Sequence, residues 1–195
     1  MKIYEHRINK ISQLRDISPD RGVEVDIRTY HGNIVLAHDP FEQGELFTEW
    51  LESWNGQSLI INVKEEGLER YILDLLSNYN VEDFFFLDQS YPSIRRLINL
   101  GISKLATRVS DFEDIDTALK SGSDWVWLDS FTGQWDYLPQ IIRQLYKTGQ
   151  KTCLVSPELQ RSGAQAELKK LNELISSQNL DITAVCTKYP ESWIK

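Results

Sequence analysis

Short apolar runs alternate along the chain with longer segments in which apolar residues recur every three or four positions. Eight runs have the length and the β-branched or aromatic content of buried strands. They are 2–6, 22–28, 58–64, 83–89, 104–110, 124–131, 151–156 and 181–187. The main helical patterns between them are 67–80, 91–101, 114–122, 137–149 and 164–178. This alternation is typical of parallel βα units.

Eight such units predict an α/β fold, a compact (β/α)₈ TIM barrel, because a closed barrel leaves no edge strand unpaired. The repeat is short, about 24 residues per unit, and leaves no room for an inserted domain. We therefore interpret 1–195 as a single barrel domain. A doubly wound open sheet is the alternative architecture.

The second unit contains an additional turn. His31-Gly32-Asn33 is a turn signal only a few residues after the second run. We expect residues 33–38 to fold back as a short β extension, which would bring His38 over the strand ends.

Two carboxylates interrupt the second apolar run. Side chains alternate along a strand, so Val23, Val25 and Ile27 share one face. Glu24 and Asp26 share the other face. In a barrel the apolar face packs against the helices, so both acids point inward near the C-terminal end of the strand, where barrel active sites are built.

The same alternation brings further side chains to this rim. It turns Asn62 and Lys64 inward on the third run, and it groups Trp127 with Asp129 on the sixth. Arg108 on the fifth run is also inward-facing. Polar side chains from several strands therefore converge on one mouth, as expected of a functional site.

A positive charge must lie beside Glu24 and Asp26, because two carboxylates in a low-dielectric interior repel each other. One interpretation is a divalent cation bound by both carboxylates and the amide oxygen of Asn62. This all-oxygen ligand set suits Mg²⁺ or Ca²⁺, with Mn²⁺ as a further candidate. The alternative is a salt-bridge network in which Lys64 and the flanking arginines neutralise the acids.

The histidines favour a reaction centre over a purely structural network. The chain has three, and two of them, His6 and His38, fall at the ends of the β segments nearest the acids. Histidine is the side chain best suited to moving protons near neutral pH. His31 lies in the turn itself, where we expect a solvated role.

Composition limits the partners. The chain has 29 acidic and 21 basic residues, a net charge of −8, which repels nucleic acid and anionic membrane surfaces. No apolar run approaches the roughly 18 residues that span a bilayer, and the first ten residues lack the apolar core of a signal peptide. We expect a cytoplasmic protein with no nucleic acid partner and no membrane insertion. Cys153 and Cys186 lack metal-site spacing and are expected to be reduced core residues.

The residues around the two acids resemble a known family, the glycerophosphodiester phosphodiesterases. They also resemble the wider group of phosphodiesterase barrels that includes phosphatidylinositol-specific phospholipase C and spider-venom phospholipase D. His6-Arg7 is similar to the family's opening His-Arg-Gly, and residues 24–40 are similar to its Glu-x-Asp, turn and His-Asp. Residues 62–64 stand where the family usually has Glu-x-Lys, and residues 186–191 resemble its final Thr-Asp-x-Pro.

The resemblance implies a short, divergent, metal-dependent phosphodiester hydrolase of lipid metabolism. The implied substrate is a glycerophosphodiester-like or related small phosphodiester. The implied roles are metal binding for Glu24 and Asp26, acid–base catalysis for His6 and His38, and phosphate binding for Arg7 and Lys64. The attacking group could be water or a neighbouring substrate hydroxyl, so hydrolysis and cyclising transfer are both open. No oligomeric state follows from the sequence.

Two further residues are candidates for substrate binding. Arg108 could grip a second anionic group, or it could pair with an acid such as Glu24 or Asp88. Trp127 could stack on a substrate group, or it could fill the core.

The chain departs from the family pattern in four places. Asn62 replaces a charged metal ligand, Ile8 stands where the family has Gly, and Lys188 stands where the last motif has Asp. The segment 40–53 is shorter than the helical insertion that often follows the His-Asp motif. These departures leave a second interpretation open, a catalytically weak or inactive barrel that binds a phosphorylated or anionic ligand. A sugar-phosphate isomerase or aldolase-type barrel is a third, but only Lys64 offers a Schiff-base lysine.

Overall fold

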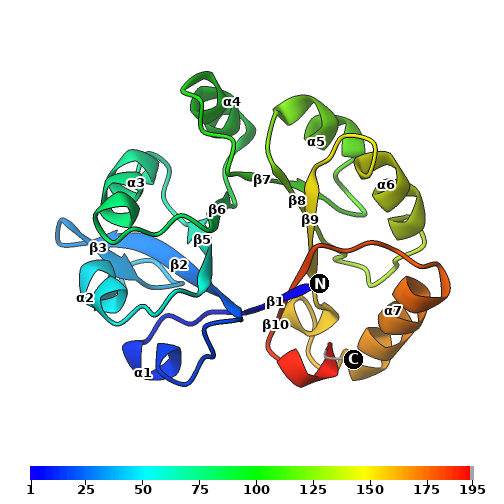
Figure 1. The fold of residues 1–195 in the computed structure, drawn as a ribbon, viewed down its shortest axis with the longest axis horizontal. Coiled ribbons are helices and arrows are strands. Elements are labelled where there is room, and N and C mark those ends of the chain that lie inside the picture. The colour runs from blue at the N-terminus through cyan, green and yellow to red at the C-terminus, as the bar shows by residue number, and fades with distance from the viewer. Residues whose placement is uncertain (194–195) are drawn as a thin grey trace.

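A curled sheet of parallel strands with helices around its outside forms the structure, a computed structural model that describes residues 1–193 (Figure 1). The parallel strands are β1 (Lys2–Glu5), β2 (Gly22–Tyr30), β5 (Ser58–Val63), β6 (Phe84–Leu87), β7 (Ala106–Val109), β8 (Trp125–Leu128), β9 (Lys151–Val155) and β10 (Ala184–Thr187). The helices are α1 (Ile11–Leu14), α2 (Phe47–Glu52), α3 (Glu69–Asn78), α4 (Tyr91–Asn99), α5 (Ile115–Ser121), α6 (Leu138–Leu145) and α7 (Gln165–Ser177), with short 3₁₀ turns at Pro157–Leu159 and Pro190–Ser192. Each of these parallel strands coincides with one predicted apolar run, although β2 extends two residues beyond its run, to Tyr30.

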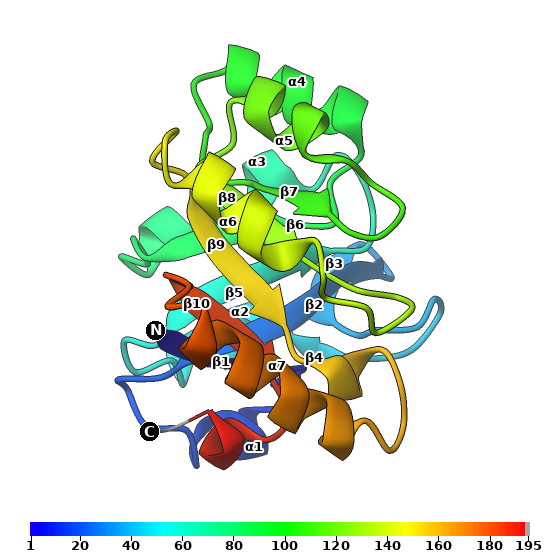
Figure 2. The ribbon, with the colours of Figure 1, turned by 90° about the vertical axis from the view of Figure 1, so that its right-hand side faces the viewer.

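Strand pairing is continuous through most of the sheet. β1 pairs with both β2 and β10, so the beginning and end of the described chain lie side by side. β2 continues through β5 to β6, and β10 continues through β9 and β8 to β7. The loops that follow the strands gather at one end of the sheet, away from the N-terminus (Figure 2).

The pairing between β6 and β7 is much thinner. It consists of one parallel bridge between Phe86 and Leu105 and a hydrogen bond of 2.9 Å from the Phe86 N–H to the Lys104 carbonyl. Both strands have four residues, and the residues just before β7 form no regular strand. The prediction of a TIM-barrel type of curled sheet is confirmed, whereas full closure of a (β/α)₈ barrel is not.

The predicted alternation of faces on β2 is confirmed. Val23, Val25 and Ile27 are fully buried in an apolar cluster that includes Phe47 and Trp50 of α2. Glu24 and Asp26 are buried on the opposite, inner face. The helices therefore anchor the strand through its apolar face, which leaves its acidic face for the interior.

Aromatic side chains fill the interior below the acids. The Tyr4 ring meets the Phe85 ring edge to face at 5.9 Å, and the Phe85 ring stacks on Trp125 at 4.3 Å. Trp127 and Cys153 belong to the same buried cluster. Both cysteines are buried and unpaired, as predicted. We call the cluster formed by Tyr4, Phe85, Trp125 and Trp127 the aromatic plug.

The predicted β extension is also confirmed. β3 (Asn33–Leu36) runs antiparallel to β2, with Tyr30 opposite Asn33, and β4 (Glu45–Leu46) pairs with β3. The two turn residues, His31 and Gly32, have φ angles of 48° and 81°, as expected in the hairpin turn whose twist matches that of the strands. The return arm leads directly to His38.

None of the helices within residues 1–193 combines the length and apolar character that crossing a membrane requires. The interpretation of 1–195 as one domain stays a prediction.

The close approach of the Tyr4 ring to the Gly22 backbone can be tested by substitution. A Cβ at this position would overlap the ring of Tyr4 on the neighbouring strand and crowd the Ser58 hydroxyl. We expect Gly22→Ala to lower the free energy of unfolding by about 1–3 kcal/mol, because a well-filled interior resists an added methyl group. Urea denaturation measures this loss. The loss should shrink when Tyr4→Leu removes the ring, and an equal loss in both backgrounds would contradict the proposed overlap.

Candidate functional site

The two carboxylates of β2 lie at the inner edge of the sheet, next to β5. Asp26 pairs in register with Asn62, and the Lys64 N–H continues the ladder by donating to the Ile27 carbonyl at 3.0 Å. Glu24 lies two residues earlier on the same face and is 1% exposed, and Asp26 is 0% exposed. The strand register therefore determines which side chains surround the acids.

Glu24 has three polar neighbours. Its carboxylate accepts hydrogen bonds from the Arg7 backbone N–H at 2.8 Å and from the Asn62 side-chain amide at 3.0 Å. The His6 Nε2 atom lies 3.8 Å away. Burial, followed by the charge of Asp26, raises the pKa of the Glu24 carboxyl above its usual range, and these contacts offset the rise only in part. An additional positive charge at this position would hold Glu24 ionised.

Asp26 is held by a residue that the sequence analysis did not identify. The Asn9 side chain donates to the Asp26 carboxylate at 2.9 Å and accepts from the Asp26 backbone N–H at 2.9 Å. Lys64 Nζ lies 3.3 Å from the Asp26 carboxylate, and Arg7 Nε lies 3.7 Å from it. Part of the salt-bridge alternative is therefore present, around Asp26. Asn9 follows the His6-Arg7 motif in the same loop, which is the only sequence signal that could have found it.

The contacts of Arg7 depend on an unusual backbone conformation. Its φ angle is 57°, in the left-handed region that a side chain with a Cβ seldom adopts. This conformation directs the Arg7 N–H toward Glu24, while the next N–H, of Ile8, donates to the Glu24 carbonyl at 2.8 Å. Backbone strain of this kind is characteristic of functional sites.

Two oxygen atoms beside Glu24 fit a hard cation. Asp26 Oδ1 and Asn62 Oδ1 are buried, lie on paired strands, and accept no hydrogen bond from any residue in 1–193, although Lys64 Nζ lies 3.3 Å from Asp26 Oδ1. Within that range there is no cluster of three His, Cys, Asp or Glu side chains that could bind a metal, so the third ligand would have to be the Asn62 amide. Carboxylate and amide oxygens are what Mg²⁺ and Ca²⁺ bind, so the donor set fits such an ion.

The two candidate histidines have contrasting surroundings. The side chain of His6 is 14% exposed, and burial, followed by the charges of Arg7, Lys188 and Lys64, lowers its pKa to about 3. The side chain of His38 is 36% exposed, and its Nδ1 lies 2.8 Å from the Asp39 carboxylate. His6 is thus a neutral imidazole among cations, whereas the neighbour of His38 is a carboxylate.

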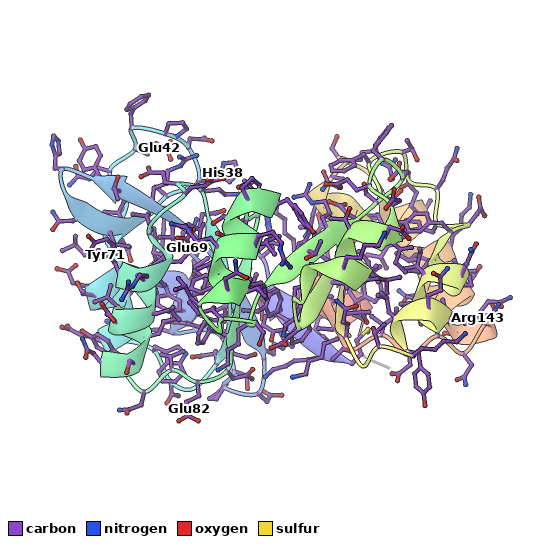
Figure 3. The ribbon with its side chains drawn as sticks, turned by 90° about the horizontal axis from the view of Figure 1, so that it is seen from above. His38, Glu42, Glu69, Tyr71, Glu82 and Arg143 are labelled. Carbon is purple, nitrogen blue, oxygen red and sulfur yellow. The ribbon has the colours of Figure 1, made fainter. Side chains whose placement is uncertain are left out.

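The rim position of His38 is visible in Figure 3, where it lies near Glu42 at one end of the molecule and Glu82 lies at the other. The β2 strand supports it, because the Arg28 guanidinium donates to the His38 carbonyl at 2.9 Å. Arg28 also lies 3.7 Å from Glu65 rather than beside the two buried acids. Arg28 therefore positions the extension and does not neutralise Glu24 or Asp26.

A chain of ion pairs continues from Lys64 across the mouth. Lys64 lies 3.5 Å from Asp88, Asp88 pairs with Arg108, and Arg108 lies 4.0 Å from Asp129. Gln160 donates to Asp129 at 2.8 Å. Arg108 thus pairs with Asp88, one of its two predicted partners, and its two acidic neighbours come from β6 and β8.

A cavity of about 710 Å³ opens beside this chain, between the ends of β5, β6 and β7. Lys64, Asp88 and Arg108 line it together with Tyr91 and Phe112. Trp127 is 5% exposed and belongs to the aromatic plug, so its environment matches the core-filling alternative.

Arg161 joins two loops of the rim. Its guanidinium pairs with Glu167 and donates to the Phe131 carbonyl at 3.4 Å. The side chain lies against Gly133, where a Cβ would overlap it. Arg161 is therefore held between the two loops, because Gly133 leaves the space that the guanidinium fills.

The structure thus brings together most of the predicted site. The residues with direct contacts around the acids are His6, Arg7, Glu24, Asp26, Asn62 and Lys64. His38 stands at the rim, at the end of the return arm of the β extension and beside Asp39. The sequence analysis missed the anchoring roles of Asn9 and Gln160, because neither stands in an apolar strand pattern.

Three solved structures with a similar architecture are glycerophosphodiester phosphodiesterases. No protein-family model matches the chain, and none of the curated protein sequences matches it. A glycerophosphodiester phosphodiesterase from Thermotoga maritima is similar with a TM-score of 0.75 and 14% identity, over 99% of this chain and 96% of that one. One from Parabacteroides distasonis ATCC 8503 has a TM-score of 0.71 and 14% identity, over 97% and 93%. One from Agrobacterium tumefaciens str. C58 has a TM-score of 0.65 and 13% identity, over 99% and 98%.

The class that the fold defines is therefore that of the TIM-barrel type of α/β proteins. Within that class, the structural neighbours are glycerophosphodiester phosphodiesterases, and the chain has their fold at 13–15% identity. The predicted resemblance to this family is confirmed at the level of the fold.

Asp129 provides a pH test of the site's electrostatics. Burial raises its pKa to about 6, although Arg108 acts in the opposite direction. Since the folded pKa exceeds the unfolded value, the acid stabilises the fold below about pH 4, and this stabilisation is lost as pH rises through 6. Asp129→Asn removes this titration. The free energy of unfolding of the variant, minus that of the wild type, should rise by up to about 3 kcal/mol between pH 4 and pH 7.

Denaturant titrations of both proteins at several pH values measure this difference. A difference that stays constant with pH would contradict the raised pKa.

Proposed function

We propose that the protein is a metal-dependent phosphodiester hydrolase that cleaves a glycerophosphodiester-like or related small phosphodiester, in the cytoplasm and in lipid metabolism. One observation carries the proposal. Glu24 and Asp26, buried on one strand, are surrounded by His6, Arg7 and Lys64 at the end of the sheet where barrel enzymes have their active sites. We treat the curled sheet as a closed (β/α)₈ barrel whose seam is the β6–β7 bridge.

Arg7 and Lys64 would bind the phosphate. A phosphodiester is an anion that repels a nucleophile, so fixed positive charge must offset its charge in the transition state. The side chains of both residues lie within 4 Å of Asp26. Arg108 is held by Asp88 on the far side of Lys64. It would contact the part of the substrate beyond the phosphate.

The two histidines would move the protons. One takes a proton from the attacking hydroxyl, whose oxygen forms the new bond to phosphorus, and the other gives a proton to the departing alkoxide as its bond to phosphorus breaks. His38 has the carboxylate partner expected of a proton donor, Asp39 at 2.8 Å. His6, which is neutral and whose Nε2 lies 3.8 Å from Glu24, would accept the other proton.

Glu24, Asp26 and Asn62 would hold the divalent cation. When bound, such a cation would withdraw charge from a non-bridging phosphate oxygen. The buried Asn62 Oδ1, which accepts no hydrogen bond within residues 1–193, supports this assignment, and so does the raised pKa of Glu24. Asn62 is neutral, so the ligands carry one negative charge fewer than a set of three carboxylates would.

The contacts of Asn62 favour one competing function. Its amide nitrogen donates to Glu24, and Lys64 lies 3.3 Å from Asp26, so protein groups already neutralise part of the acidic charge. A barrel of this kind could bind a phosphorylated or anionic ligand without turning it over. The substitutions below separate the two functions.

Replacing the proposed proton donor His38 or the proposed metal ligand Asp26 should abolish turnover and leave the fold intact. We expect His38→Ala and Asp26→Asn each to lower kcat/KM on bis(p-nitrophenyl) phosphate and on glycerophosphodiesters by at least about 100-fold, the lower range for a general acid or base. Assays contain Mg²⁺, Ca²⁺ or Mn²⁺, and circular dichroism checks the fold.

His31→Ala is the matched control, because His31 is exposed in the hairpin turn and should retain full activity. A wild-type protein that binds glycerol 3-phosphate but cleaves no phosphodiester on a broad panel would favour the non-catalytic function instead.

Restoring a third carboxylate should strengthen cation binding. Asn62→Asp adds a buried negative charge, so the melting temperature without cation should fall. The rise in melting temperature on adding Mg²⁺ or Ca²⁺ should be larger than in the wild type, because a third anionic ligand raises affinity and ligand binding stabilises the folded state.

Thermal melts with and without a chelator, together with calorimetric titration of the cation, measure both effects. An equal or smaller rise in Asn62→Asp would contradict the assignment of Asn62 as a ligand, whatever the activity of either protein.

A further inference from the structure

Three phenylalanines are exposed to solvent, and all of them lie in loops that follow strands. Phe41 is 95% exposed in the loop after β3, Phe112 is 74% exposed after β7, and Phe131 is 38% exposed after β8. The other four phenylalanines of the chain are at most 8% exposed. Chance exposure of single apolar residues is common, but confinement of all three to one end of the molecule is not expected.

These side chains stand on opposite sides of the mouth. Phe112 and Phe131 face each other with ring centroids 6.2 Å apart, and the Arg108 guanidinium lies 5.6 Å from the Phe131 ring. Phe41 belongs to the β2 extension, three strands away from β7 around the sheet. Figure 3 places its neighbour Glu42 at the same outer end as His38. A flat surface that touched both aromatic groups would cover the candidate site.

The loops hold the rings out rather than letting them fold inward. Phe41 has a φ angle of 66°, a conformation that is rare and strained for a bulky residue. The Asp111 carboxylate accepts hydrogen bonds from the N–H groups of Phe131 at 2.9 Å and Thr132 at 2.8 Å, which braces the pair formed by Phe112 and Phe131. The contact between Phe112 and Phe131 leaves both rings exposed, and within residues 1–193 no ring or cation contact accompanies Phe41, so an external apolar medium is the consistent explanation.

The charges around the three phenylalanines indicate which kind of apolar surface they would contact. Asp39 and Glu42 flank Phe41, and Asp111 and Glu113 flank Phe112. These carboxylates would be repelled by an anionic lipid surface and attracted by the outward ammonium groups of a zwitterionic one. A protein partner would need a continuous apolar patch at the centre of the contact, whereas here polar residues separate the two aromatic groups.

We propose that Phe41, Phe112 and Phe131 adsorb the protein to a zwitterionic lipid surface, with the mouth of the site facing the lipid. The rings enter the interfacial region only, since adsorption through aromatic side chains requires no spanning segment. This inference is independent of turnover, because it concerns where the protein binds and not what it cleaves.

Vesicle sedimentation tests the proposal. The wild-type protein is mixed with phosphatidylcholine vesicles, and the partition coefficient is compared with that of the triple variant Phe41→Ser/Phe112→Ser/Phe131→Ser. We expect the triple variant to lose at least about tenfold, since each ring removes apolar area from the lipid contact. The matched control is Tyr71→Ser/Tyr146→Ser, which removes aromatic residues that are 65% and 77% exposed but lie on or beside helices away from the mouth. The control should bind within about twofold of the wild type.

Two further measurements sharpen the test. A Phe112→Trp variant should show a blue-shifted tryptophan emission on binding, because the new ring enters the interface. Vesicles in which a third of the lipid is phosphatidylglycerol should bind the wild type several-fold more weakly at low salt, with recovery at high salt.

Three results would overturn the proposal: no binding to phosphatidylcholine, equal binding by the triple and control variants, or binding that requires anionic lipid. Sedimentation velocity tests the remaining alternative, that a second copy of the chain covers these rings. If the wild type self-associates and the triple variant does not, the surface formed by Phe41, Phe112 and Phe131 is an interface between copies of this chain and the lipid assignment is wrong.

Discussion

Neutralising two carboxylates inside the sheet is the constraint on which the site depends. Glu24 and Asp26 are almost fully buried on one face of β2, and their mutual repulsion would destabilise the fold if it were left uncompensated. Groups from two other segments reduce it. The first loop contributes the Arg7 N–H and the Asn9 side chain, and β5 contributes Asn62 and Lys64. The need to balance this charge therefore brings the loop of His6 and the end of β5 to the same point.

The same logic extends around the mouth and reinforces the weakest part of the sheet. Asp26, Lys64, Asp88, Arg108 and Asp129 alternate in sign along successive strands from β2 to β8. The pair formed by Asp88 and Arg108 crosses from β6 to β7, where the backbone contributes a single bridge. Side-chain charge at the rim thus joins two strands that the hydrogen-bond ladder barely connects, so the residues that shape the mouth also help to hold the sheet curled.

Sequence pattern was sufficient for the features that depend on periodicity. The alternation of Val23, Val25 and Ile27 with Glu24 and Asp26 follows directly from the strand repeat, and the hairpin follows from the turn residues His31 and Gly32. Contacts between loops were beyond its reach. Asn9 lies in irregular backbone, so no period shows that its amide will meet Asp26. Arg161 is positioned by the space above Gly133. The sequence around Arg161 and the sequence around Gly133 do not show that these two residues meet in the folded chain.

The aromatic plug limits how a ligand can enter and leave the site. Tyr4, Phe85 and Trp125 occupy the interior between the acids and the N-terminal ends of the strands, and all three are at most 7% exposed. The interior is therefore closed at the N-terminal ends of the strands. Whatever enters at the rim must leave by the same opening, so a departing molecule obstructs the next arrival, and the time it takes to diffuse out sets a ceiling on how often the site can be refilled.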